Sequence, residues 1–156
     1  MANFLLIHGS CHGAWCWRDV VSALEKLGHS ANAIDLPSHG ADPTPVADVT
    51  LDSYARRILD ALTSPTILVG HSMAGYPISL AAELAPQNIR RLVYLCAYVP
   101  AAGKTLADMR RAAPRQPILH AVQLSQDRSS FTLDPAHIHD LFYHDCPDGT
   151  LEYAMT

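Results

Sequence analysis

Charged residues are scarce in this chain, and no stretch of it concentrates charge of one sign. Asp, Glu, Lys and Arg make up 17% of the 156 residues, the formal net charge is −4, and hydrophobic residues account for 49%. Binding to nucleic acid or to an anionic membrane needs clustered Lys and Arg, so we expect neither nucleic acid nor a membrane as a partner. The hydrophobic content excludes intrinsic disorder and predicts a globule with a substantial core.

The sequence also lacks a long hydrophobic run, a signal peptide and paired cysteine motifs. Its longest apolar run, residues 92–102, is too short to cross a bilayer. Met1-Ala2-Asn3 precedes the first apolar run without a basic region or a cleavage site, which predicts a cytoplasmic protein. The four cysteines show neither C-x-x-C nor metal-type spacing, so we expect free thiols. We expect neither a metal site nor a cofactor.

Short apolar runs alternate with helical patterns through the first two thirds of the chain. Expected strands are residues 4–8, 30–36, 66–69 and 92–99, and expected helices are residues 15–27, 51–62 and 76–85, with Thr50 as the N-cap of the second helix. Such alternation predicts right-handed crossovers and an α/β fold, with a parallel sheet covered by helices on both faces. The predicted strand order is second, first, third, fourth.

After Gly103 the pattern changes, and we expect no further strong strand. Short helical pieces are predicted near residues 104–113 and from Pro135 onward, where Asp134 precedes the proline as a cap. We therefore expect two parts. Residues 1–103 form the N-terminal part of an α/β core, and residues 104–156 form a cap-like helical segment that is incomplete.

The most informative stretch is Gly70-His71-Ser72-Met73-Ala74-Gly75, which directly follows the expected strand at residues 66–69. Ser72 falls at a strand-to-helix corner, where the backbone of a serine is strained and the neighbouring residues must be small. The flanking glycines and Ala74 meet that requirement. The stretch departs from G-x-S-x-G at Ala74, but the strand before it and the helix after it predict a nucleophile elbow.

Two further motifs accompany the elbow. The three are LLIHGSCHGAW at residues 5–15, DLPSHG at residues 35–40 and VGHSMAG at residues 69–75. Together they resemble the α/β-hydrolase superfamily, and within it the group of plant methylesterases, salicylate-binding esterases and hydroxynitrile lyases with their bacterial esterase relatives. The resemblance implies a carboxylesterase-like serine hydrolase that acts on small carboxylic esters through an acyl-enzyme. By it, Ser72 is the nucleophile, and the backbone N–H groups of Ser10 and Met73 form the oxyanion hole.

A serine nucleophile also needs a histidine base and a carboxylate that orients it, and in this fold the chain order is Ser, Asp, His. The histidines after Ser72 all lie in the cap-like segment, and we interpret them as exposed residues of short helices; they are His120, His137, His139 and His144. We expect the natural polypeptide to continue beyond residue 156 into further strands that bear the acid and the base. If the chain is complete instead, the apolar strand at residues 92–99 is an exposed edge through which we expect a homodimer.

Three alternatives remain from the sequence. Hydroxynitrile lyases of this group carry a threonine hydroxyl at the position of Gly9, so the glycine favours an esterase. A dinucleotide-binding domain would use Asp35 for the ribose, but the glycines after the first strand are spaced G-x-x-x-G and not G-x-G-x-x-G. The third alternative is a catalytically incomplete member of the same fold that binds a small ligand without turning it over.

Overall fold

The computed structural model describes all residues from Met1 to Thr156 and divides into two compact units. Unit 1 is Met1–Met109 and unit 2 is Arg110–Thr156. The boundary predicted after residue 103 from the change of sequence pattern stays a prediction, because compactness alone does not define a domain.

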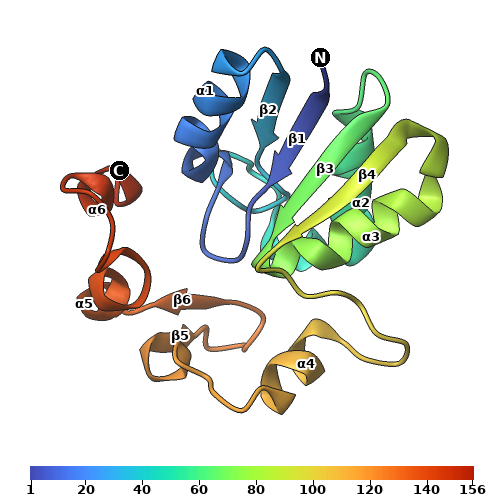
Figure 1. Ribbon diagram of the computed structural model, residues 1–156. Helices are drawn as coiled ribbons and strands as arrows, with labels where there is room; N and C mark the ends of the chain where they lie inside the picture. Colours follow the sequence, from blue (N-terminus) through green and yellow to red (C-terminus); the bar gives the residue numbers. More distant parts are fainter. The chain divides into compact units, whose positions relative to one another are not determined.

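A four-stranded parallel sheet forms the centre of unit 1 (Figure 1), and its strand order β2-β1-β3-β4 confirms the predicted order. The strands are β1 (Asn3–Ile7), β2 (Ser30–Ile34), β3 (Thr66–His71) and β4 (Ile89–Leu95). The helices between them are α1 (Arg18–Lys26), α2 (Leu51–Asp60) and α3 (Gly75–Leu84). Shorter 3-10 turns are η1 (Ala14–Trp17), η2 (Val46–Asp48), η3 (Ser72–Ala74) and η4 (Pro86–Asn88).

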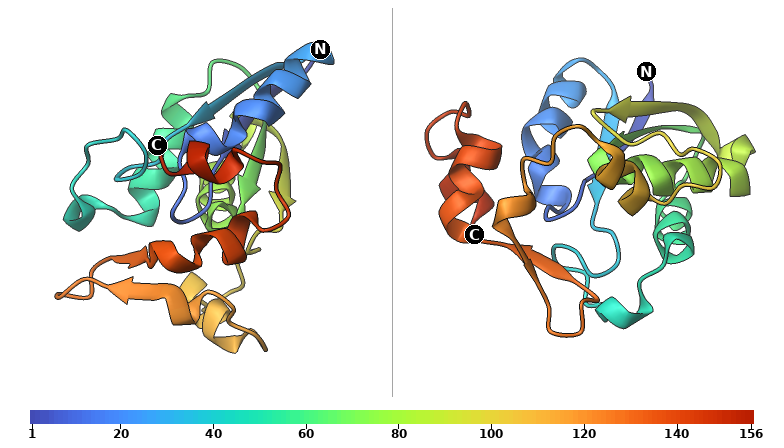
Figure 2. Two further views of the ribbon diagram at one scale, coloured as in Figure 1. Left: turned by 90° about the vertical axis from the view of Figure 1, so that its left-hand side faces the viewer. Right: turned by 90° about the horizontal axis from the view of Figure 1, so that it is seen from below.

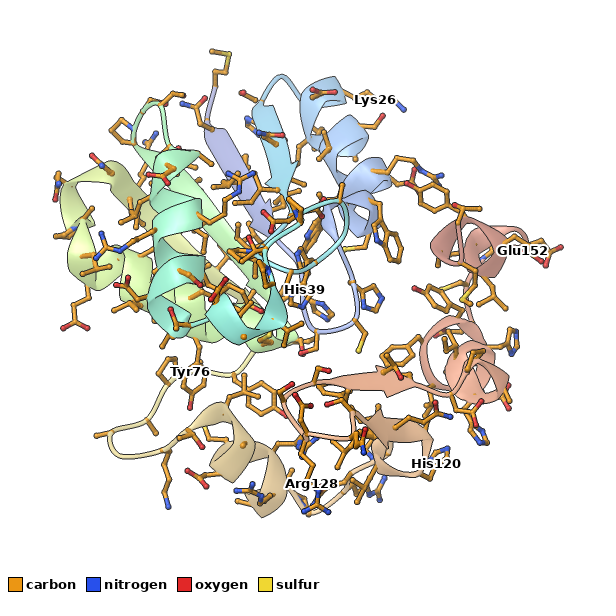
Figure 3. The ribbon with its side chains drawn as sticks, turned by 180° about the vertical axis from the view of Figure 1, so that it is seen from behind. Lys26, His39, Tyr76, His120, Arg128 and Glu152 are labelled. Atoms are coloured by element: carbon orange, nitrogen blue, oxygen red, sulfur yellow. The ribbon has the colours of Figure 1, made fainter.

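Successive residues of the central strands pack on opposite faces of the sheet, as the pleat of a strand requires. On one face, Leu5 and Ile7 of β1 belong to a core with residues of α2 and α3, the face seen in Figure 3. On the other face, Leu6 packs with Trp17 and with α1. The helices therefore cover both faces of the sheet, as predicted from the alternation of strands and helices.

Two helix ends carry capping residues. Thr50 caps α2: its hydroxyl accepts from Ser53 N at 3.0 Å, while the Ser53 hydroxyl accepts from Thr50 N at 2.9 Å. This reciprocal capping box stabilises the first turn of the helix. Gly28, just after α1, has φ +81°, a conformation that only glycine adopts without strain.

The fourth strand differs from its prediction at both ends. β4 begins at Ile89 and ends at Leu95, whereas the apolar pattern predicted residues 92–99. The strand stops because Cys96 has φ +45°, outside the range of extended backbone. β4 is the edge strand that the sequence predicted, and none of its residues is buried; Leu95 is 45% exposed.

Unit 2 corrects the expectation that no strand follows Gly103. β5 (Val122–Leu124) and β6 (Phe131–Leu133) pair antiparallel in a small hairpin (Figure 2). Each strand is only three residues long, too short for an alternating pattern to stand out in the sequence. The loop between them also lacks glycine, and Arg128 takes the left-handed conformation there, with φ +60°.

Short helical segments complete the chain. They are α4 (Leu106–Ala112), which spans the unit boundary, and in unit 2 η5 (Leu119–Ala121), α5 (Pro135–Ile138), the π-helical η6 (His139–Tyr143) and α6 (Thr150–Ala154). Asp134 caps α5 as predicted, accepting from Ala136 N at 2.9 Å. No helix has the length and apolar character needed to cross a membrane. All four cysteines are free thiols, as predicted.

Candidate active site

A sharp strand-to-helix corner is present at Ser72. β3 ends at His71, η3 opens at Ser72, and α3 begins at Gly75. The φ angle of Ser72 is +55°, in the left-handed region that few residues other than glycine occupy. A serine held in a strained conformation at such a corner is the backbone arrangement of a nucleophile elbow.

The glycines around Ser72 are required by close contacts. A Cβ atom on Gly70 would lie 2.8 Å from the Ile78 side chain and 3.0 Å from the backbone carbonyl of Ala74. A Cβ atom on Gly75 would overlap the carbonyl oxygen of Tyr98. The corner therefore closes only around small residues, in agreement with the requirement stated from the sequence.

The segment after β4 supports the corner. Tyr98 N donates a hydrogen bond to the Ser72 carbonyl at 3.0 Å. The left-handed conformation of Cys96 turns the chain out of the strand just before this contact. The strained residue is thus held by a main-chain bond from the neighbouring strand end, which offsets part of the cost of its conformation.

The loop after β1 lies against the elbow. A Cβ atom on Gly9 would be 2.9 Å from the Ser72 Cβ atom, so the two backbones approach as closely as glycine allows. The Ser10 hydroxyl lies 3.4 Å from the Met73 sulfur atom, within hydrogen-bond distance for sulfur. The structure thus brings together Ser72, Ser10 and Met73, the three residues singled out from the sequence.

Both main-chain donors of this group are unpaired within the protein. The Ser10 N–H donates no hydrogen bond, and the Met73 N–H lies in the first turn of η3, where backbone N–H groups have no intrahelical partner. Two free N–H groups beside a serine are able to stabilise negative charge that develops on a nearby oxygen.

The nearby histidines of unit 1 are engaged with the backbone or with other rings. His8 is fully buried between Gly9 O and Leu36 N, and burial lowers its pKa to about 4. His12 Nδ1 bonds Ser10 O at 3.0 Å. His71 meets Trp17 edge-on, and burial lowers its pKa as well. No hydrogen bond joins the Ser72 hydroxyl to any of these rings, so unit 1 does not assemble a serine–histidine pair.

Asp35 ties two loops of unit 1 together. Its carboxylate accepts from Ala14 N at 2.6 Å and from Ala41 N at 3.1 Å, and Gly13 and Gly40 leave room for it. The Asp35 carboxylate is therefore already engaged in holding the two loops together. The dinucleotide alternative thereby loses the acid that was to bind a ribose.

In unit 2 the histidines pair among themselves and with a neighbouring carboxylate. The ring of His120 stands edge-on to that of His137 at 4.8 Å, and His139 bonds Asp140 at 2.8 Å. His120, His139 and His144 are exposed, as interpreted from the sequence, while His137 is partly buried. No group of three or more His, Cys, Asp or Glu side chains is placed to hold a metal ion.

Three structural roles in this site were not predicted from the sequence. Each role is a hydrogen bond to a main-chain group that lies far away in the sequence. These bonds join Tyr98 to Ser72, Asp35 to Ala14 and His8 to Leu36. His8 and Asp35 stand inside the motifs that carry the resemblance, but their types alone do not reveal which N–H or carbonyl each one meets. Tyr98 acts through its backbone, so its side chain carries no signal.

The parallel sheet, the elbow and the adjoining loop define an α/β-hydrolase architecture. The chain belongs to the alpha/beta hydrolase family, whose sequence model matches residues 4–155.

Relatives by sequence include esterases of plants. Esterase PIR7B of Oryza sativa subsp. japonica is 35% identical over 169 aligned residues, which cover 97% of this chain and 63% of that protein. Methylesterase 7 of Arabidopsis thaliana is 41% identical over 105 residues, which cover 63% of this chain and 40% of that protein. The chain thus spans about 63% of the length of the rice relative that it matches throughout.

Solved structures agree with the fold. The crystal structure of polyneuridine aldehyde esterase matches with a TM-score of 0.83 at 25% identity, covering 99% of this chain and 67% of that one. The pyrethroid hydrolase PytH matches with a TM-score of 0.83 at 28% identity, covering 96% of this chain and 64% of that one.

Proposed function

We propose that this chain is part of a serine hydrolase that cleaves small carboxylic esters through an acyl-enzyme on Ser72. The observation that carries the proposal is the strained corner at Ser72, with φ +55°, in contact with a loop whose Ser10 N–H has no partner. The names of the similar proteins, an esterase, a methylesterase and a pyrethroid hydrolase, support the same class of reaction.

In this proposal the Ser72 hydroxyl oxygen attacks the ester carbonyl carbon, and its proton passes to a histidine base. The carbonyl oxygen becomes an oxyanion and accepts hydrogen bonds from the Ser10 and Met73 N–H groups. The C–O bond to the alcohol then breaks, and the alcohol leaves with the proton from the base. Water hydrolyses the acyl-enzyme by the same steps and releases the carboxylic acid.

The base and the acid are proposed to lie in the part of such a protein that this chain does not span. The histidines of unit 1 nearest the elbow support this, because His8 and His12 already bond main-chain carbonyls. The His71 ring stands edge-on to Trp17 and makes no hydrogen bond with the Ser72 hydroxyl. The similar plant esterases are longer than this chain and leave room for both groups.

Ester hydrolysis is favoured over cyanohydrin cleavage by the space around Gly9. Any side chain there would begin 2.9 Å from the Ser72 Cβ atom and 3.2 Å from His71 Nδ1. A hydroxyl-bearing residue would therefore need the elbow to move, and Gly9 itself offers no hydroxyl to a cyanohydrin.

The test is labelling of the natural full-length protein that contains this chain by a serine-directed fluorophosphonate, together with turnover of small methyl and aryl esters. We expect a single adduct on Ser72, located by mass spectrometry, and loss of both labelling and turnover in Ser72→Ala. Ser53→Ala, which removes a half-buried serine of the α2 capping box, serves as the control for a serine outside the site and should label normally. Ester turnover that survives in Ser72→Ala would refute the proposal. A Ser72 that binds ester analogues but neither labels nor turns them over would point to the ligand-binding alternative.

A further inference from the structure

His8 follows β1 directly and is fully buried, with an exposed fraction of 0%, and both of its ring nitrogens meet main-chain groups. Nε2 lies 3.1 Å from Leu36 N, an amide that can only donate, so Nε2 carries no proton. Nδ1 lies 2.8 Å from Gly9 O, a carbonyl that can only accept, so Nδ1 carries the proton. The surroundings therefore fix a neutral ring in one tautomer.

The carbonyl that His8 holds belongs to the same peptide unit as the Ser10 N–H. A peptide unit is planar and trans, so its C=O and N–H point in opposite directions, and anchoring the oxygen fixes the direction of the N–H. A hydrogen bond to the carbonyl also polarises the peptide and strengthens its N–H as a donor. On the next peptide unit, His12 Nδ1 bonds the Ser10 carbonyl at 3.0 Å. Two imidazoles thus hold the carbonyls on either side of the Ser10 N–H, which itself has no partner in the protein.

We propose that His8 is the positioning residue of the oxyanion hole, because its Nδ1–H holds the Gly9 carbonyl and thereby aims the Ser10 N–H at the oxyanion formed on attack by Ser72. The inference rests on the proposed function of Ser72 and Ser10. His8 touches no substrate and exchanges no proton in the reaction. It acts through a single peptide unit.

Two substitutions separate this role from a merely structural one. In His8→Asn, the side-chain amide nitrogen takes the place of Nδ1, so the bond to Gly9 O is kept and the acceptor for Leu36 N is lost. In His8→Gln, the side-chain oxygen takes the place of Nε2, so the acceptor for Leu36 N is kept and the bond to Gly9 O is lost. Each variant loses one buried hydrogen bond, and a structural role predicts similar effects on turnover.

In the natural full-length protein that contains this chain, we expect kcat for a small methyl ester to fall about 10- to 100-fold in His8→Gln with KM nearly unchanged. Removal of one oxyanion donor costs about 10² to 10³, and a misdirected donor is weakened rather than removed. In His8→Asn we expect a loss of about threefold or less, a rescue by the variant that keeps the donor. Ile58→Ala, a change at a fully buried core residue of α2, controls for stability and should leave kcat nearly unchanged.

Equal kcat values in His8→Gln and His8→Asn would overturn the inference. If Ser72→Ala keeps its activity, the proposed function fails; if Ser72→Ala is inactive while His8→Gln retains full kcat, only the role of His8 fails. A measurement on the unmodified protein serves where a variant does not fold. Long-range ¹⁵N–¹H NMR spectra of histidine-labelled protein must show His8 protonated on Nδ1, and a ring protonated on Nε2 would contradict the inference.

Discussion

Replacement of Gly75 by alanine tests whether packing or backbone preference decides the elbow. Gly75 has φ −57° and ψ −33°, ordinary helical values, so its conformation does not require glycine. Helix propensity alone predicts that Gly75→Ala stabilises the protein by about 0.5–1 kcal/mol. The contacts predict the opposite sign, because the new Cβ atom would overlap the Tyr98 carbonyl oxygen and lie 3.3 Å from Ala97 Cβ.

The size of the effect follows from what must move. Overpacking of this kind costs about 1–3 kcal/mol. A shift of Tyr98 also weakens its N–H bond to the Ser72 carbonyl, a further loss of about 0.5–1.5 kcal/mol. After the gain in helix propensity, we expect the free energy of unfolding to fall by about 0.5–4 kcal/mol. The same shift releases the strained residue, so fluorophosphonate labelling of Ser72 should slow.

Urea unfolding and labelling rates are measured together, with Gly28→Ala as the matched control. Gly28 has φ +81° and no atom within 4 Å of a new Cβ, so alanine there costs about 1–2 kcal/mol through backbone strain alone. Both variants should lose stability, but only Gly75→Ala should label more slowly. A Gly75→Ala protein as stable as the parent would refute the reasoning.

Two further predictions concern groups that hold the site. The free energy of unfolding should fall by roughly 3 kcal/mol as the pH drops from 6.5 to about 4. Burial lowers the pKa of His8 from 6.5 to about 4 in the folded protein, so the unfolded chain takes up the proton first. Urea unfolding at stepped pH should show a shallower fall in His8→Gln, and parallel curves for the two proteins would contradict this role of His8. Asp35→Asn should lower the free energy of unfolding by about 2–4 kcal/mol, because an uncharged amide replaces a carboxylate that accepts two main-chain N–H bonds. Hydrogen exchange of the Ala14 and Ala41 amide protons should become faster in this variant. Unchanged exchange at both residues would contradict the role given to Asp35.

Most of the sheet could be predicted from the sequence, because the apolar runs of its strands are bounded by clear breaks. The strand order was confirmed, and so was the Thr50 cap, which the residue type at the start of α2 indicated. The end of β4 was placed wrongly because residues 96–99 are apolar, and only the φ angle of Cys96 ends the strand there. Apolar character predicts burial or strand content and does not report a single left-handed residue.

In the candidate site, features that depend on side-chain type could be predicted and features that depend on the backbone could not. The corner at Ser72 could be predicted because its requirement for small residues is written in side-chain types, as the contacts at Gly70 show. The backbone interactions that support the corner could not be predicted, since the bond from Tyr98 N to Ser72 O involves no side chain. The tautomer of His8 likewise depends on Leu36, which lies 28 residues away in the sequence. The catalytic roles of Ser72, Ser10 and Met73 stay predictions.

The two bonds of the Asp35 carboxylate have a consequence for how this protein can change. They join the turn that leads into η1 to the loop after β2, because each of these segments donates an N–H to one oxygen atom of the same carboxylate. An insertion or deletion in either loop would withdraw one N–H from that shared anchor and displace the other loop with it. A change in the length of one loop therefore calls for a compensating change in the other, because Asp35 holds both.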